Sequence, residues 1–549
     1  MVRLGMRCAA MLAAVLGLSS CGSDDSDDGP TDDGGQAREA LTPVALLTRA
    51  SLDLRGVRPQ LSELSRIEAH PEEVDEMIAT FVDDPAFGER VKDMFAGAWR
   101  TRIDTYRLPA EAYEGENAAL THAAIGEEPL NLIAYIALND LSFATLLESP
   151  DTFVDPRLME LWPLEPVDDD NGMKLPPGVV RARYVDGRPA AGVLSMNAVY
   201  WRHASTVENA NRGRANALSQ ALLCQSYLDR PIDFPSDLDL TDSESIRTAI
   251  ATNPACQGCH STLDPLASYL WGFNYGDVDQ PRPEYSAANE RAWQVYTDAA
   301  PGFFGKTGDR MVDLAAHVAS DERFVACTVR RVYEGMLGRR STLSDEGALA
   351  VHREAFIEGG LRLKSLARSI LTDPSYRGEA WEPRFGGAPE PVYDKVAPVG
   401  VLSSSLIDLS GYALTYDGRP ATRLDVALRP LAGGSDRGDT TNVSTGAVLV
   451  QRRLAQAGAL FAVDTAVAGE SSGGRLDEFL AGADLESTPS SEDLVALVRL
   501  VRSETLEAAD PEIDALLGVW AEVAEIESPT DAWVAVVTAA LADPNHLLY

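Results

Sequence analysis

Basic residues are scarce in this chain. Its 47 lysines and arginines stand against 84 aspartates and glutamates, which gives a formal net charge of −37. A nucleic-acid-binding protein needs a basic surface to neutralise phosphates, and no cluster of basic residues occurs here. The composition therefore disfavours nucleic acid as a partner. An acidic surface suits a soluble exported protein, and solubility alone accounts for it more readily than the steering of a basic partner protein.

Long apolar runs and several enzyme motifs are also lacking. After the first 20 residues, no stretch approaches the length and hydrophobicity of a membrane span. The Gly-rich segment 433–446 lacks the spacing and the lysine of a phosphate-binding loop, and no serine lies in a nucleophile-elbow pattern. The sequence thus gives no support to a membrane-spanning protein, a P-loop enzyme or an α/β-hydrolase.

Cysteine and histidine are rare, with six and seven copies, yet Cys256, Cys259 and His260 form a Cys-x-x-Cys-His motif. Two thiols at this spacing can each add to a haem vinyl group, and the imidazole of the histidine then binds the iron. A structural zinc site needs four ligands, and no second Cys-x-x-Cys or His-x-x-x-His occurs. A thioredoxin-like redox pair belongs to a βαβ unit, which this segment does not resemble. We therefore predict one covalent haem c per chain.

The N-terminus has the features of a lipoprotein signal. Arg3 and Arg7 precede a short apolar run that ends in Leu-Ser-Ser-Cys at 18–21. This pattern predicts cleavage after residue 20 and lipidation of Cys21. Gly22 comes next, which favours the outer membrane over the inner one. We expect a lipid-anchored protein whose body lies in the periplasm or at the cell surface, on an acidic, disordered tether at 21–38.

Two cysteines remain after these assignments. Cys8 leaves with the signal, Cys21 takes lipid, and the motif takes haem, so Cys224 and Cys327 are left in an oxidising compartment. We predict a disulfide between them. Two separately buried free thiols are the alternative.

Apolar residues recur mostly every three to four positions, which predicts a mainly α, multidomain protein with a cytochrome-like segment in its middle. Strand-like stretches are confined to Val179–Val185 and Ala447–Val450. A helical run that ends in Asp-Pro-x-(aromatic or His) occurs three times, at 77–87, 366–376 and 536–546. We expect the Asp to cap the next turn of chain and the ring after it to pack back. The predicted order is signal 1–20, tether 21–38, N-terminal helical domain 39–165, haem domain 179–285, helical companion domain 300–383, linker 384–398 and C-terminal helical domain 399–549.

The haem motif lies in a longer pattern. After His260 the chain continues with Leu-Asp-Pro-Leu at 263–266, then Phe273 and Gly276. With this extension the chain resembles the exported cytochrome-like domain families first catalogued in planctomycetes. Upstream, the matching positions are Gly192, Leu194, His203, Arg212-Gly213 and Leu223-Cys224. The segments 324–340 and 366–377 are similar to the helical domain that usually comes next, and 49–67 to another companion with a Leu-Asp-Leu-x-Gly-x-x-Pro signature.

The sequence suggests one iron ligand and several candidates for the second. We expect Nε2 of His260 to bind iron and its Nδ1–H to bond a backbone carbonyl near Asp264 and Pro265. His203 matches a family position and is the first candidate for the distal ligand. The alternatives are Met311, then Met196 and His317.

Side chains that contact the rest of the haem are also predicted. Trp271 stands where relatives carry a polar residue, so we expect it to wall the haem and make its edge more apolar, together with Trp201, Tyr269 and Phe273. Arg212 and Arg214 are candidates for the propionates. A solvated basic spot is the alternative for these arginines.

Three functions are compatible with these features. The first is a monohaem c-type cytochrome lipoprotein that transfers electrons to a redox partner protein in the cell envelope. The second is a haem enzyme that activates peroxide or oxygen at an open distal site, although no acid/base constellation accompanies the motif. The third is an envelope binding or scaffold protein in which the haem is structural.

Overall fold

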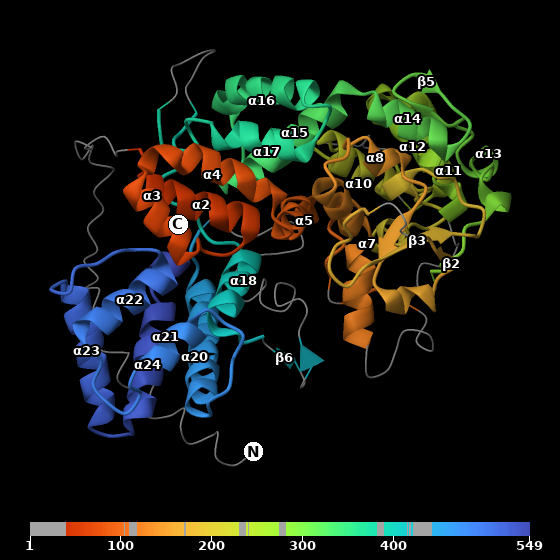
Figure 1. Cartoon of the computed structure of the whole chain (residues 1–549). Coiled ribbons are helices and arrows are strands. Elements are labelled where there is room, and N and C mark those ends of the chain that lie inside the picture. Colours follow the sequence, from red (N-terminus) through yellow and green to blue (C-terminus); the bar gives the residue numbers. More distant parts are fainter. Residues whose placement is uncertain are drawn as a thin grey trace.

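The structure is a computed structural model of the whole chain. It describes residues 40–103, 105–108, 118–168, 172–229, 238–239, 241–273, 281–380, 389–413, 415–416, 419–420 and 442–549. The protein is mainly α, and short strands make up only small sheets (Figure 1).

The N-terminal region is a set of helices, some of which begin and end at residues with clear capping roles. In α2, for example, the Thr42 side chain accepts a hydrogen bond from the Ala45 amide, Pro43 stands in the first turn, and Gly56 ends the helix at a φ of 73°. The elements are α2 (Pro43–Arg55), α3 (Leu61–Ala69), η2 (Pro71–Glu73), α4 (Val74–Thr80), η3 (Phe81–Asp83), α5 (Ala86–Trp99), α7 (Ala118–Leu138) and α8 (Thr145–Glu148).

A three-stranded antiparallel sheet comes after α8. Its order is β1-β3-β2, with Thr152 opposite Ala182 and Leu164 opposite Tyr184. The elements are β1 (Thr152–Val154), η4 (Pro156–Met159), β2 (Leu164–Pro166) and β3 (Val180–Tyr184). The first of the two predicted strand-like stretches is thus a strand.

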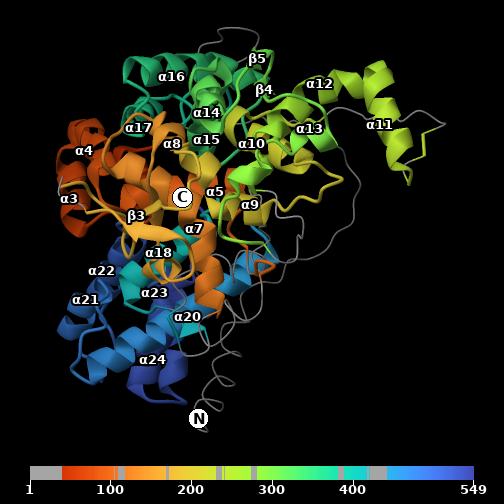
Figure 2. The ribbon, with the colours of Figure 1, turned by 90° about the vertical axis from the view of Figure 1, so that its right-hand side faces the viewer.

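The middle of the chain contains the Cys-x-x-Cys-His motif and the helices that support it. The elements are η5 (Gly192–Ser195), α9 (Asn197–Arg202), α10 (Arg212–Leu223), α11 (Ser243–Thr252), α12 (Pro254–Ser268), η6 (Trp271–Phe273), η7 (Ala287–Asn289), α13 (Trp293–Tyr296), β4 (Gly302–Phe303), β5 (Lys306–Thr307), α14 (Met311–Ala319), α15 (Glu322–Leu337), η8 (Leu343–Asp345), α16 (Glu346–Glu358) and α17 (Leu363–Leu371). Figure 2 shows α11 and the start of α12 projecting from one side of the molecule.

The C-terminal region packs below the N-terminal helices in Figure 1. Its elements are α18 (Val399–Ser410), β6 (Thr415–Tyr416), β7 (Arg419–Pro420), α20 (Thr445–Val467), α21 (Leu476–Gly482), α22 (Ser491–Arg502), α23 (Pro511–Ala524), α24 (Pro529–Leu541) and η9 (Pro544–His546).

The strand expected at Ala447–Val450 was wrong, because these residues form part of α20. Ser444 caps this helix by accepting a hydrogen bond from the Ala447 amide at 3.0 Å. Ala447, Val450 and Leu454 are buried at intervals of three and four residues, which is the helical period. The short apolar run gave no means to tell a strand from a helix.

The buried apolar side chains form two main cores. One cluster extends from Leu46 to Val392, so the three regions predicted between 39 and 383 share one core. A second cluster extends from Val399 to Leu547. The motif helix α12 contributes Leu263, Leu266 and Ala267 to the first core, which fixes its C-terminal half and leaves its N-terminal half at the surface.

The three Asp-Pro segments use one local structure, as the sequence predicts. Asp84, Asp373 and Asp543 each accept a hydrogen bond from the amide two residues later, at 2.8 Å in every copy. The ring after each turn is buried: Phe87, Tyr376 and His546. The repeat is therefore a structural device, in which a capped turn inserts a ring into the core.

A buried polar hub joins the parts of the chain. Asp53 accepts hydrogen bonds from Lys395 Nζ at 2.5 Å, Tyr376 at 2.7 Å and Tyr549 at 2.8 Å. Arg49, one turn earlier on α2, donates to the carbonyl oxygens of Tyr376 and Val392. The Leu-Asp-Leu-x-Gly signature thus supplies, through Asp53, the centre of this hub.

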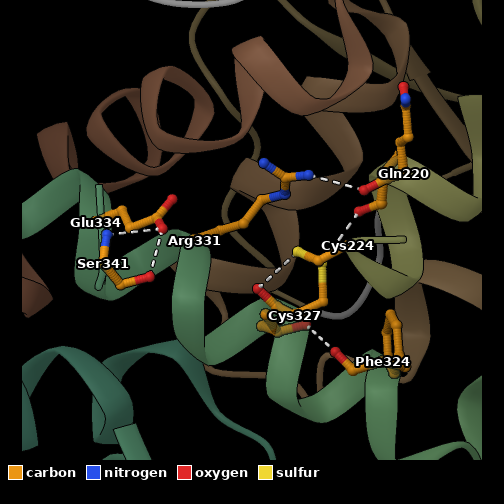
Figure 3. The surroundings of a disulfide bond; sticks show 9 residues. Gln220, Cys224, Phe324, Cys327, Arg331, Glu334 and Ser341 are labelled. Carbon is orange, nitrogen blue, oxygen red and sulfur yellow. Dashed lines mark hydrogen bonds between the residues drawn. A yellow bond between two sulfur atoms is a disulfide. The ribbon is translucent and has the colours of Figure 1, made fainter. Parts of the chain in front are cut away.

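Cys224 and Cys327, the two cysteines that the sequence pairs, are joined by a disulfide whose Cα atoms are 5.3 Å apart. It ties the C-terminal end of α10 to the middle of α15 (Figure 3). Close by, Arg331 of α15 donates a 2.8 Å hydrogen bond to the Gln220 carbonyl of α10. The disulfide closes a loop of 103 residues that contains the entire Cys-x-x-Cys-His segment.

Candidate functional site

The Cys-x-x-Cys-His motif lies in the first turns of α12. Asn253 caps this helix by accepting a hydrogen bond from the Ala255 amide at 2.8 Å, and Pro254 occupies the first turn. Cys256, Cys259 and His260 are three and four residues apart, so they lie on one face of the helix. Both thiols are free and half-buried. The helix thus presents two thiols and an imidazole together at the surface.

His260 is fixed by a carboxylate on the next turn of the same helix. Its Nδ1 lies 2.9 Å from Oδ1 of Asp264. A carboxylate only accepts, so Nδ1 is the donor, and in the neutral ring Nε2 then holds the lone pair. No hydrogen-bond partner of Nε2 occurs among the residues that the structure describes. The expected backbone carbonyl is replaced by the Asp264 side chain, because four residues along a helix bring two side chains together.

Asp264 is itself held by Arg212 in a two-point ion pair. Nε of Arg212 lies 2.7 Å from Oδ1 and Nη2 lies 2.9 Å from Oδ2. Burial opposes ionisation of Asp264, but the hydrogen bonds from Arg212 and His260 outweigh it, and its pKa is lowered from the ordinary value. Asp264 is therefore a carboxylate shared between an imidazole and a guanidinium.

The chain before α10 is shaped to place Arg212 at the helix start. Ala210 and Asn211 both adopt left-handed backbone conformations, with φ of 51° and 63°. The Asn211 amide donates to Ser205 Oγ at 2.9 Å, and Oδ1 of Asn209 accepts from the Gly213 amide at 2.9 Å. These bonds offset the cost of the unusual backbone and fix the direction from which Arg212 reaches α12.

Arg214, two residues later, has a different role. Its guanidinium donates to the carbonyl oxygens of His203 at 2.7 Å, Phe273 at 2.8 Å and Tyr200 at 3.3 Å. It is 4% exposed. Arg214 therefore ties the end of α9 to the segment after α12, inside the protein.

The structure places the distal-ligand candidates in other contacts. Nε2 of His203 lies 3.3 Å from the Trp99 carbonyl, to which it donates. Burial, then the charge of Arg202, lowers the pKa of His203 to about 4. The sulfur of Met311 accepts contacts from the hydroxyls of Ser195 and Tyr200 at 3.9 Å, inside the first core.

The two weaker candidates are engaged as well. Met196 is 1% exposed within the first core. His317 is half-buried, and its Nε2 lies 3.0 Å from the Thr307 carbonyl.

Trp271 lies beyond the C-terminal end of α12, whereas the motif lies at its N-terminal end. The helical rise separates His260 from Ser268 by on the order of 12 Å. The Trp271 ring is buried and stacks on Tyr296 with 4.9 Å between ring centres. Its Nε1 has no hydrogen-bond partner among the described residues. Gly276 of the family pattern lies outside them.

The disulfide and the motif are linked through one short segment. Tyr227, three residues after Cys224, donates a 3.2 Å hydrogen bond to Thr262 Oγ1 on α12. Burial raises the pKa of Tyr227, and Cys259 adds to this effect. The disulfide therefore fixes the C-terminal end of α10. This helix carries Arg212, and the chain that follows it contains Tyr227, which contacts α12.

Other metal chemistry finds no support at the motif. Within the described ranges, no three His, Cys, Asp or Glu side chains form a group that could hold a metal ion. A structural zinc would need such a group. A haem iron does not, since the porphyrin supplies four ligands and the protein one or two.

A second histidine with polar partners lies in the companion helices. Nδ1 of His352 is 2.9 Å from Ser369 Oγ, and Nε2 is 2.7 Å from Oδ2 of Asp373. His352 is 2% exposed. A cavity of about 290 Å³ is lined by other residues, including Asp151, Arg183 and Arg188. The three side chains, of His352, Ser369 and Asp373, are thus a buried hydrogen-bond set, and none of them lines that cavity.

The lipoprotein signal, Cys21 and the acidic tether lie outside the described residues. In the part of the chain that the structure does describe, no helix is both long and apolar enough to cross a bilayer.

Comparison with known proteins gives one family. Residues 190–280 match the PSCyt3 family model, described as a protein of unknown function (DUF1588). This segment includes the elements from η5 through η6 and contains the motif, Arg212 and Asp264. It supports the resemblance to the planctomycete cytochrome-like domains. No curated protein and no solved structure matches the chain.

Proposed function

We propose that this protein is a monohaem c-type cytochrome that transfers electrons at the bacterial cell envelope. The observation that carries the proposal is the surface of α12, where two free thiols and an imidazole with an open Nε2 lie on one face. The PSCyt3 match over residues 190–280 supports a cytochrome-like domain at this place.

The residues fit a covalent haem in three respects. Each thiol, of Cys256 and Cys259, would add across one vinyl group, with sulfur bonding one carbon and hydrogen the other, so no electrons are gained or lost. His260 would bind iron through Nε2, because Asp264 already holds Nδ1. A Cβ atom on Gly258 would meet no atom within 4 Å, so the motif borders open space. The bound haem supplies one-electron redox chemistry.

The N-terminus supports the site of action. Lipid on Cys21 would hold the protein at the outer membrane, and the acidic tether at 21–38 would separate the folded body from the bilayer. The net charge of −37 favours a basic redox partner. Palmitate labelling in the producing cell should mark the wild type and not a C21A variant. Unlabelled wild-type protein would refute the anchor while leaving the haem proposal intact.

The haem proposal is tested by expression in a host with c-type maturation machinery. The wild type should show a c-type α-band in pyridine haemochrome and should keep its haem after acid–acetone extraction. C256S/C259S should lose the covalent haem. The matched control is C224S/C327S, which removes the other cysteine pair and should retain it. A wild type without covalent haem would overturn the proposal.

A second candidate, a haem enzyme that activates peroxide or oxygen, is favoured by one observation. Neither His203 nor Met311 is free to bind iron, because each is engaged elsewhere in the fold. An open sixth position would give high-spin ferric iron that binds cyanide at micromolar to millimolar concentrations. A low-spin ferric spectrum that cyanide leaves unchanged would exclude this candidate and favour electron transfer.

A further inference from the structure

The carboxylate beside His260 is placed by the fold, and not by chance proximity at the surface. Asp264 is 5% exposed, one turn after His260 on α12. Its two oxygens accept three side-chain hydrogen bonds, one from His260 and two from Arg212. Arg212 comes from a different helix, 52 residues earlier. An ordinary surface ion pair does not need two helices and a left-handed loop to form it.

A hydrogen bond from the far nitrogen of a metal-binding histidine has known consequences. It fixes which nitrogen carries the proton, orients the ring and raises the basicity of the nitrogen that binds metal. A carboxylate does this more strongly than a backbone carbonyl, because a charged acceptor makes the stronger hydrogen bond. A more basic axial ligand stabilises ferric over ferrous iron and lowers the reduction potential.

We propose that Asp264 is a positioning residue that fixes His260 as the Nδ1-protonated tautomer and lowers the haem potential, and that Arg212 moderates it. This inference rests on the proposed haem site. Arg212 draws part of the Asp264 charge toward itself through its two-point pairing. The pair therefore sets how strongly Asp264 acts on His260, and Arg212 acts on the iron through this relay and not through a propionate.

The two members of the relay predict shifts of opposite sign. D264N keeps the shape and an acceptor oxygen but removes the charge, so the haem potential should rise. Loss of such a contact commonly changes metal affinity or activity 10- to 100-fold. A tenfold change in a one-electron equilibrium corresponds to about 59 mV. R212Q should lower the potential, because Asp264 then gives its full charge to His260.

The matched control is another buried histidine–carboxylate pair in the same chain. D373N weakens the contact of Asp373 with His352, which is 2.7 Å long and lies outside the motif. It should lower the thermal stability without moving the haem potential. A shift in D373N as large as in D264N would show that the potential reports general destabilisation.

A haem-independent measurement separates this inference from the function on which it rests. In full-length C256S/C259S protein with ¹⁵N-labelled histidines, the His260 resonances should report a protonated Nδ1 and an unprotonated Nε2. H260Q in the same background assigns the signals. D264L removes both charge and acceptor and should abolish the preference for this tautomer.

The outcomes are distinct. A wild type without covalent haem overturns the proposed function. Covalent haem with equal potentials in wild type, D264N and R212Q overturns the relay alone. An Nε2-protonated His260 in the haem-free protein overturns it as well. If D264N fails to fold, the haem potential of R212Q and the His260 tautomer in the C256S/C259S protein still test the relay.

Discussion

Nδ1 of His260 lies 2.9 Å from Oδ1 of Asp264, and this contact determines which imidazole nitrogen is available. The carboxylate accepts a hydrogen bond from Nδ1–H, so in the neutral ring Nε2 is the nitrogen with the lone pair, on the helix that carries Cys256 and Cys259. The geometry that a haem requires is therefore prepared within one helix. The fold adds Arg212 from a second helix, which turns a local pair into a three-residue relay.

Acid should destabilise the folded protein through His203. Its pKa is about 4 in the fold against 6.5 ordinarily, because burial and neighbouring arginines disfavour the charged ring. Between these values the unfolded state binds more protons, so stability is complete above about pH 6.5 and falls as the pH drops toward 4. The loss is on the order of 3 kcal/mol. Urea unfolding at several pH values measures it. H203Q, which keeps a donor for the Trp99 carbonyl, should lose this part of the pH dependence; an unchanged profile would contradict the assignment.

Removal of the Cys224–Cys327 disulfide should destabilise the protein by roughly 3–5 kcal/mol, because it closes a 103-residue loop. Thermal unfolding of C224A/C327A against the wild type gives the size of the effect. The double variant avoids a stray free thiol. An unchanged midpoint would mean that the contacts between α10 and α15 alone hold this region.

D53N should destabilise the protein by about 3–5 kcal/mol, because it removes the buried counter-charge of Lys395. Burial already lowers the pKa of Lys395 to about 8, so a lysine without its partner is costly. Y376F, which removes one of the three donors to Asp53, should cost only about 1 kcal/mol. The midpoints of guanidinium unfolding rank the two variants. Equal losses would argue against a charge-centred hub.

Arg214 and Arg212 should give opposite results when each is replaced by glutamine. R214Q should lower the stability by several kcal/mol, on the order of 3, because buried carbonyl oxygens lose their donor. It should leave the potential of the haem nearly unchanged. R212Q should shift the potential with a smaller loss of stability, since Arg212 is partly exposed. Calorimetry and redox titration of both variants test this contrast. A potential shift confined to R214Q would contradict the relay.

The features that depend on neighbouring residues could be predicted from the sequence. The spacing of Cys256, Cys259 and His260 places them on one helical face, and the Asp-Pro turns cap as their residue types predict. The mainly α class is predicted by the period of apolar residues. The His260–Asp264 contact was also within reach, because residues four apart on a helix meet, but we expected a backbone acceptor instead.

Tertiary structure decided the contacts between distant residues. Arg212 reaches Asp264 across 52 residues, and His203 reaches the Trp99 carbonyl across 104. Both residues look available for haem in the sequence, where only their type is visible. A side chain's partners depend on which helices pack together in the core. Burial of apolar surface drives that packing, and because it is non-directional, a sequence pattern does not show which helices will meet. The helical period thus determined that Cys256, Cys259 and His260 share one face of α12. The packing of α10 against α12 determined that Arg212 contacts Asp264, the partner of His260.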